Sequence, residues 1–219
     1  MEYTLNFRDI WTQTDALLGG IGVTLAISTL TIAVGLIIGS AGAAGSIYGG
    51  KLLRSFVFGY VEIIRNTPLI VQLFIVFFGL PSIGIRLSPL TATMIAISIN
   101  FGAYSTEIIR AGLEAIPRSQ IEAGQCLGLS GGEIFRYVVL PPAIKAVYPA
   151  LTSQFLLVML GTSVASQIST PDLFHVASVI QSKTFRDFEI YLVISIIYLA
   201  LALMLKTAFH FIEKWMLGR

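Results

Sequence analysis

The chain has 219 residues, of which 55% are hydrophobic and only 12% are charged. A soluble domain of this size carries about twice that share of charged residues, so the composition excludes an ordinary soluble protein. It indicates a single integral membrane domain over residues 1–219, surrounded by lipid. The formal net charge of +2 comes from basic residues dispersed around apolar spans, and no nucleic-acid partner is expected.

Five apolar segments are long enough to cross a membrane. A helix needs about 20 apolar residues to cross a hydrocarbon core roughly 30 Å thick. The segments are 18–47, 55–80, 88–111, 148–168 and 189–212. No basic segment precedes a short apolar run at the start of the chain, so we expect no cleaved signal peptide. The predicted fold is therefore all-α, with five transmembrane helices.

The first span contains Gly35 and Gly39, a spacing that lets membrane helices pack closely. The segment after it, 45–52, comes within one residue of a phosphate-binding loop. Its eighth residue is Leu52, which lacks the hydroxyl that binds magnesium, and the segment follows an apolar span rather than a strand. We therefore expect no nucleotide site in this chain.

The second span carries Arg65 near the middle of the membrane, roughly 15 Å from the inner end of the span. An arginine at that depth costs at least about 2.5–3.5 kcal/mol, so it should face a cavity or a partner. Pro68 frees the carbonyl of Ile64, and interrupted helices near the midplane often build transporter substrate sites. Two interpretations remain open: Arg65 holds a substrate, or Glu62 neutralises it from one turn earlier.

The third span places Thr93, Asn100, Tyr104 and Glu107 on one polar stripe. Such a stripe faces protein or water rather than lipid. We expect Asn100 to form hydrogen bonds between spans. We expect Glu107 to pair with Arg110 near the inner end.

The longest polar interruption follows, within residues 113–145. Ser119 with Glu122, and Ser130 with Glu133, have the spacing of a capping box, and Gly128 lies between them. The pattern predicts two short helices joined at a glycine with positive φ.

Pro141 and Pro142 are expected to stop the second short helix. By its spacing alone, the interruption is either a well-capped loop between two membrane helices or a docking surface. Cys126, the only cysteine in the chain, lies in it and is expected to be a free thiol.

The fourth span ends with Thr162, Ser163, Ser166 and Gln167, of which the last three share a helical face. Hydroxyls in membrane helices often bond to their own backbone, so each alone is weak evidence of a site. His175 is predicted to lie on the opposite side of the membrane from His210. The two cannot share a metal ion, and we find neither a metal site nor a catalytic group.

The distribution of basic residues predicts an outer N-terminus and an inner C-terminus. With this orientation nine basic residues are inside and four are outside, and the interruption within 113–145 lies in the cytoplasm. The inner residues are Lys51, Arg54, Arg110, Arg118, Arg136, Lys145, Lys206, Lys214 and Arg219, and the outer ones are Arg8, Arg86, Lys183 and Arg186.

Three separated motifs resemble the permeases of ATP-binding-cassette (ABC) importers. Glu122-Ala123, Gly128 and Leu140-Pro141 are similar to the EAA loop of that family, with Gly124 in place of its second alanine. Segments 65–81 and 103–124 resemble the branch that transports polar amino acids such as histidine, glutamate, glutamine and arginine. The resemblance covers most of the chain.

The resemblance implies a type I importer permease fold in the bacterial cytoplasmic (inner) membrane. It also implies a second permease subunit, identical or related, two cytoplasmic ATPase subunits and an external solute-binding protein. ATP and magnesium would belong to the ATPase, so this chain is expected to be neither an enzyme nor a carrier of its own cofactor. It would move an amino acid by alternating access.

The expected substrate-binding residues are Arg65, Asn66, Thr67, Gln72, Thr162 and Ser163. The residues expected to couple to the ATPase are Ser119, Glu122, Ala123, Gly124, Leu127, Gly128, Leu140 and Pro141. The family often has an acidic residue where this chain has Gly161, which favours a neutral or acidic substrate side chain over a cationic one.

Two other classes remain alternatives. A pore or secondary carrier working without ATP would also use a midplane arginine, although it has no need for a rigid docking surface. A simple membrane anchor would gain nothing from the cost of Arg65.

Overall fold

The computed structural model describes residues 5–218, and every regular element in that range is a helix. Arg219, counted above among the inner basic residues, lies outside the described residues. The α-helices are α1 Arg8–Trp11, α2 Thr14–Tyr48, α3 Lys51–Arg65, α4 Leu69–Phe74, α5 Pro89–Glu114, α6 Arg118–Cys126, α7 Gly131–Glu133, α8 Leu140–Gly161, α9 Leu173–Thr184 and α10 Asp187–Leu217. Ile75–Gly79 and Ile134–Val139 are π-helical turns, and Leu80–Ile83 and Thr162–Ile168 are 3-10 helices.

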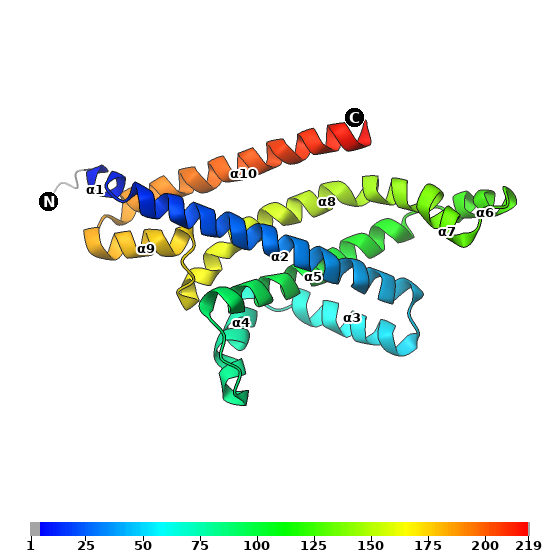
Figure 1. The fold of residues 1–219 in the computed structure, drawn as a ribbon, viewed down its shortest axis with the longest axis horizontal. Coiled ribbons are helices and arrows are strands. Elements are labelled where there is room, and N and C mark those ends of the chain that lie inside the picture. The colour runs from blue at the N-terminus through cyan, green and yellow to red at the C-terminus, as the bar shows by residue number, and fades with distance from the viewer. Residues whose placement is uncertain (1–4, 219) are drawn as a thin grey trace.

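Helices α2, α5 and α8 run along one another as the central bundle (Figure 1). The contact between α2 and α5 is the most extensive, because glycines on α2 admit side chains of α5. A Cβ atom on Gly35 would collide with the ring of Phe101, and one on Gly39 with the side chain of Ser105. Ser105 donates a hydrogen bond across this contact to the carbonyl of Gly35, at 3.0 Å. The glycine pair therefore packs helices, as its spacing predicts.

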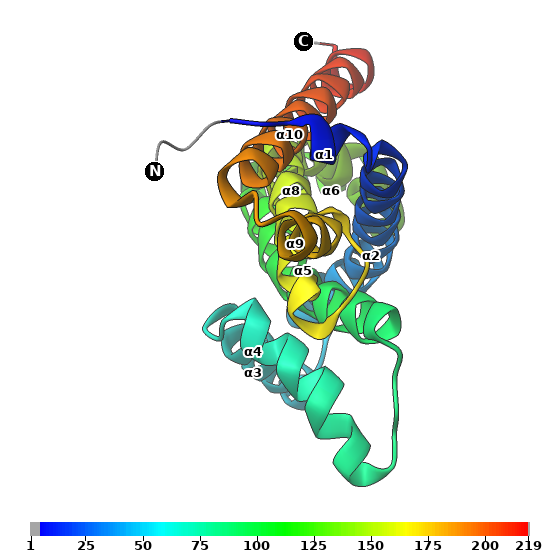
Figure 2. The same cartoon turned by 90° about the vertical axis from the view of Figure 1, so that its left-hand side faces the viewer.

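The two ends of the bundle have different structures (Figure 1). At one end α6 and α7 extend beyond the bundle, and at the other end α9 lies beside α2 and the start of α10. Seen from the α9 end, α9 lies beside α2 and α10, and α3 and α4 lie to one side of this group (Figure 2). A buried apolar cluster that includes Ile10, Leu17, Leu173 and Ile190 holds the α9 end together.

Three helical stretches of the described chain are long and apolar enough to cross a membrane: Thr14–Tyr48, Gly131–Ile168 and Asp187–Trp215. The expected span at 55–80 is not one helix, because Lys51–Arg65 and Leu69–Ile83 meet at an angle of 107°. Together they count as a fourth candidate. The third expected span is the 26-residue helix α5, which is long enough to cross but is more polar.

The prediction that Pro141 and Pro142 end a helix is wrong. Both lie in the first turn of α8, which continues directly from the π-helical turn Ile134–Val139. The turn before them is π-helical rather than α-helical, so the two prolines do not interrupt a run of α-helical hydrogen bonds. The expected fourth span, 148–168, therefore belongs to a longer helical stretch, Gly131–Ile168.

Candidate functional site

The break between α3 and α4 lies at residues 66–68. Pro68 has φ −65° and ψ 139°, an extended conformation that turns the chain out of α3. The carbonyl that it frees is bound by Gln72, whose Nε2 donates to the oxygen of Ile64 at 2.8 Å. Gln72 Nε2 also lies 3.0 Å from the carbonyl oxygen of Thr67 and 2.9 Å from its hydroxyl. The side chain of Gln72 thus bridges the break with hydrogen bonds.

Gln72 also joins the break to α5. Its Oε1 accepts a hydrogen bond from Asn100 Nδ2 at 3.0 Å, which confirms the predicted role of Asn100 between spans. Gln72 is 8% exposed, and both ends of its amide are bonded within the protein. The structure therefore gives Gln72 a positioning role, and its direct contact with a substrate stays a prediction.

Arg65 is the last residue of α3, and its side chain is 37% exposed. Its guanidinium carbon lies 5.5 Å from the centre of the Tyr104 ring, and its Nη1 lies 4.0 Å from Oε1 of Glu107. Among residues 5–218, no group accepts a hydrogen bond from the Arg65 guanidinium. A fork of N–H donors beside an opened helix is thus available to an anionic group.

Glu62 is not the partner of Arg65, although it lies one turn earlier on α3. Its Oε2 accepts a hydrogen bond from Asn66 Nδ2 at 3.0 Å. The ion pair of Arg65 within the described part of the chain is with Glu107 on α5. The local neutralisation that the sequence left open is therefore replaced by an inter-helix contact.

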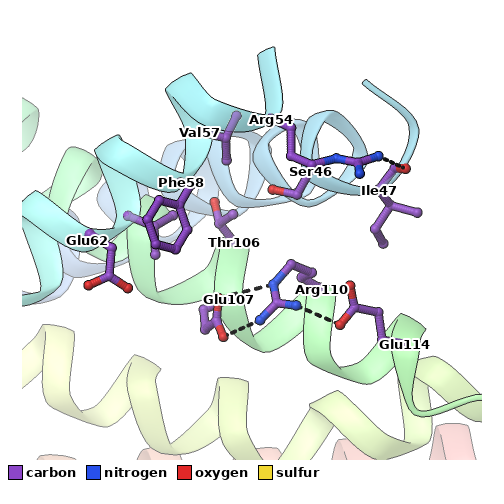
Figure 3. Close-up of a pocket in the computed structure, with 11 residues that line it drawn as sticks. Ser46, Ile47, Arg54, Val57, Phe58, Glu62, Thr106, Glu107, Arg110 and Glu114 are labelled. Atoms are coloured by element: carbon purple, nitrogen blue, oxygen red, sulfur yellow. Dashed lines mark hydrogen bonds and ion pairs between the residues drawn. The ribbon is translucent and has the colours of Figure 1, made fainter. Parts of the chain in front are cut away.

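Glu107 starts a chain of ion pairs along α5 (Figure 3). Arg110 donates to both of its oxygens, from Nη2 at 2.6 Å and from Nε at 3.2 Å. The Nη1 of Arg110 donates to Glu114 at 2.6 Å. This confirms the predicted Glu107–Arg110 pair and extends it to the last residue of α5, where the interrupting loop begins.

Two cavities are lined by the contacts of Arg65, although Arg65 itself lines neither of them. One, of about 480 Å³, lies between α2, α3 and α5 and is lined by Glu62, Glu107 and Arg110 among others (Figure 3). The other, of about 180 Å³, lies between α4, α5 and α8, and its polar lining is Asn100, Tyr104 and Gln154. Each contact of Arg65 therefore lines a different cavity, Glu107 the larger one and Tyr104 the smaller one.

The sequence did not indicate that Tyr104 and Glu107 contact Arg65, and Gln154 was not singled out. The polar stripe identified Tyr104 and Glu107 without assigning them to Arg65, because the sequence does not say which helices pack together. Gln154 follows Thr152 and Ser153 in the predicted fourth span, and an amide side chain inside an apolar span is the signal that could have found it.

Thr162 and Ser163 lie in the 3-10 helix that continues α8. Thr162 is fully buried, and its hydroxyl donates to the carbonyl of Met159 at 2.8 Å. Ser163 donates to Leu160 at 2.7 Å. In the described structure neither hydroxyl is hydrogen-bonded to Arg65, so their part in one site with Arg65 stays a prediction.

The second interruption, after α6, is closed by backbone hydrogen bonds. Gly128 has φ +77°, as predicted, and its N–H donates to Gln125 while that of Leu129 donates to Gly124. These two bonds form a Schellman motif, which requires a left-handed residue at the position of Gly128. Gly124, which replaces the alanine of the EAA pattern, lies where α6 packs against Ile134, and a Cβ added to it would lie 3.2 Å from Cγ1 of Ile134.

Ser130 caps α7 as predicted: the hydroxyl of Ser130 accepts from the Glu133 backbone, and the Glu133 carboxylate accepts from the Ser130 backbone. These hydrogen bonds hold the pKa of Glu133 below its usual value. The capping box predicted for Ser119 and Glu122 is wrong, because α6 begins one residue before Ser119 and its N-cap residue is Pro117.

The surface of α6 carries most of the predicted coupling residues. Ser119, Glu122, Ala123 and Leu127 are exposed, and they follow one stripe of the helix. Leu127 is 80% exposed, although it is apolar. Pro141 is also exposed, whereas Leu140 is half-buried.

Residues 31–218 match the family described as binding-protein-dependent transport system inner membrane component. The chain belongs to this family. It is therefore a membrane permease, it resides in the inner membrane, and it works with ATPase and binding-protein components. A pore or carrier that works without ATP is not supported.

Two curated relatives and two solved structures are similar to this permease. It is 34% identical over 209 residues to the glutamine transport system permease protein of Escherichia coli (strain K12), covering 94% of this chain and 95% of that protein. It is 35% identical over 197 residues to the L-cystine transport system permease protein of Bacillus subtilis (strain 168), covering 90% and 84%.

The crystal structure of an amino acid ABC transporter with histidines matches with a TM-score of 0.91 and 34% identity, over 97% of this chain and 99% of that one. An inward-facing structure of the MetNI methionine ABC transporter matches with a TM-score of 0.78 and 19% identity, over 94% and 98%. The second likeness concerns the fold alone. Together these matches show the fold of a type I importer permease.

Proposed function

We propose that this permease, paired with a second permease subunit, forms the path by which a polar amino acid crosses the inner membrane. Two cytoplasmic ATPase subunits hydrolyse ATP with magnesium, and an external solute-binding protein delivers the amino acid. Closure of the ATPases switches the path between inward and outward access. The names of the relatives, which include glutamine and L-cystine permeases, support this class of substrate.

The observation that carries the proposal is the guanidinium of Arg65. It lies beside a helix break that Gln72 bridges, and its contacts Glu107 and Tyr104 each line a cavity. None of the described residues accepts a hydrogen bond from it. A carboxylate matches this fork with two parallel hydrogen bonds, so Arg65 holds the α-carboxylate of the amino acid. Asn66, Thr67, Thr162 and Ser163 complete the proposed site, and Gln72 holds the break in place.

The side chain of the proposed substrate is neutral or acidic. Gly161 supplies no negative charge near the end of α8, and a Cβ built on it would meet Leu69 of α4 at 3.6 Å. The uncharged side chain of glutamine, named for the Escherichia coli relative, agrees with this preference.

The loop at about 113–145 is the proposed docking element for the ATPase. Its Schellman motif and capping box fix the angle between α6 and α7 without help from the bundle, as a docking surface requires. The exposed stripe of Ser119, Glu122, Ala123 and Leu127 is the proposed contact, with Gly124, Gly128, Leu140 and Pro141 shaping its support.

Substitution of Arg65 by lysine tests the site. Lysine keeps the charge but cannot form two parallel hydrogen bonds, so Arg65→Lys should weaken amino-acid uptake into vesicles by about 10-fold or more while the subunits still assemble. Arg86→Lys, in the exposed segment before α5, is the matched control and should transport normally. Unchanged affinity in Arg65→Lys would remove Arg65 from the site.

A further inference from the structure

The carboxylate of Glu107 has unused capacity to accept hydrogen bonds. Arg110 takes one position on each of its two oxygens. A carboxylate offers about four such positions, so about two remain. The Glu107 side chain is 32% exposed and lines the cavity of about 480 Å³, where a small solute has room to approach it (Figure 3).

The distance between Arg65 and Glu107 is longer than a hydrogen bond. Their nearest atoms, Nη1 and Oε1, are 4.0 Å apart, whereas Glu107 and Arg110 approach to 2.6 Å. Arg110 therefore holds the carboxylate on its own helix and keeps it from closing on Arg65. The guanidinium of Arg65 and the carboxylate of Glu107 are therefore close together without a hydrogen bond between them.

A free α-amino acid has the charge pattern that this pair would recognise. Its ammonium and carboxylate groups are bonded to the same carbon atom, so their partners must lie only a few ångströms apart and carry opposite charges. Resting on the proposed role of Arg65, we infer that Glu107 binds the α-ammonium group of the substrate. Arg65 and Glu107 then bind the two charged groups of the zwitterion, while other residues contact the substrate side chain.

The other two carboxylates of the cavity are less suited to this role. Glu62 accepts its hydrogen bond from Asn66, and Glu114 is bound to Arg110 at the far end of α5. In the described part of the chain, Glu107 is the carboxylate that forms an ion pair with Arg65. It alone can act together with Arg65 on groups that share one carbon atom.

Binding of substrate analogues to the assembled transporter tests the inference. The permease with its ATPase subunits is placed in nanodiscs without binding protein, and radiolabelled L-glutamine is displaced by two analogues. Glutaramate lacks the α-ammonium group, and 4-aminobutanamide lacks the α-carboxylate. The wild type should prefer L-glutamine to either analogue by about 10- to 100-fold, the range for a charge-assisted hydrogen bond.

In Glu107→Gln, the affinity ratio of L-glutamine to glutaramate should fall close to 1. The affinity ratio of L-glutamine to 4-aminobutanamide should stay as in the wild type. Glu107→Asp keeps the charge and should retain part of the first preference. Glu114→Gln, the matched control at the far end of the ion-pair chain, should retain both. If Glu107 had only a structural role, Glu107→Gln would weaken the binding of all three ligands by the same factor.

The possible failures are distinguishable. If Glu107→Gln keeps the full preference over glutaramate, the inference is wrong, while the proposed role of Arg65 stands as long as Arg65→Lys loses the preference over 4-aminobutanamide. If Glu107→Gln does not assemble, Glu107→Asp decides the question. The inference is overturned if Glu107→Asp keeps the full wild-type preference over glutaramate and binds all three ligands more weakly by the same factor. If the wild type does not distinguish the three ligands, both proposals fail.

Discussion

The chain interrupts its helices at residues 66–68 and again at residues 127–130, and the two interruptions are closed by different means. The first is closed by the side chain of Gln72, which also reaches Asn100 on α5. The second is closed by the backbone bonds around Gly128 and by the Ser130 cap, all between residues close in sequence. The first interruption is also hydrogen-bonded to another helix, whereas the bonds that close the second are all local.

This difference matches the work proposed for each place. A substrate site must change shape between inward and outward access, and hydrogen bonds between helices can be exchanged as the helices move. A docking element must transmit force, and a bend fixed by local bonds moves as one body.

The largest effect concerns the side of the membrane on which the second interruption lies. Cys126 is exposed at the end of α6, and the basic-residue count places it in the cytoplasm. A membrane-impermeant thiol reagent added to intact cells should leave it unlabelled. Ser82→Cys in a Cys126→Ser background should be labelled, since residue 82 is exposed on the predicted outer side. The opposite pattern would reverse the orientation and remove the docking proposal.

Gln72→Leu should destabilise the structure of the first interruption, at residues 66–68. Leucine fills similar space but leaves the Ile64 carbonyl and the Asn100 amide without their partner, at about 1–3 kcal/mol for each group that stays buried. The midpoint of thermal unfolding in detergent should fall, and uptake should fall with it. Gln167→Leu, at an exposed position, is the control and should keep the wild-type midpoint. A stable Gln72→Leu variant would show that the break does not need this brace.

Gly128→Val should disturb the second interruption while leaving the bundle folded. A left-handed backbone costs a side-chain-bearing residue roughly 1–2 kcal/mol, and β-branching adds to this. No atom would touch the new Cβ, so the effect comes from φ alone. We expect weaker ATPase docking and ATP hydrolysis uncoupled from uptake in vesicles.

Gly132→Val is the matched control for that variant. Its site also has open space around a new Cβ, but its φ is not positive. It should remain coupled. Equal coupling in both variants would show that the angle between α6 and α7 is not required.

The smallest effect concerns the cap of α7. Ser130→Ala should destabilise this turn by about 1 kcal/mol, seen as faster amide hydrogen exchange in residues 131–134. Because the pKa of Glu133 is lowered, its contribution is present above its unfolded pKa and is lost as pH falls through the folded value. Acidification should therefore speed exchange in the wild type. Glu133→Gln should lack this pH dependence, and an equal response in both would exclude the carboxylate.

The sequence alone determined the features that rest on local chemistry. The apolar lengths located α2, α5 and α10, the glycine pattern predicted the bend at Gly128, and the spacing of Ser130 and Glu133 predicted their capping box. The proline rule failed at Pro141 and Pro142, because whether a proline ends a helix or begins one depends on the turn before it. The capping box predicted at Ser119 was also wrong, because α6 begins one residue earlier, at Arg118.

Only the tertiary structure decided which polar groups meet. The spacing along α3 predicts Glu62 as a partner of Arg65. In the structure, helix packing instead brings Glu107 and Tyr104 of α5 next to Arg65, and Glu62 accepts a hydrogen bond from Asn66. Periodicity tells which residues share a face of one helix and says nothing of the helix that this face will contact. An arginine within an apolar segment is evident from the sequence, whereas its partners are set by how α3 and α5 pack.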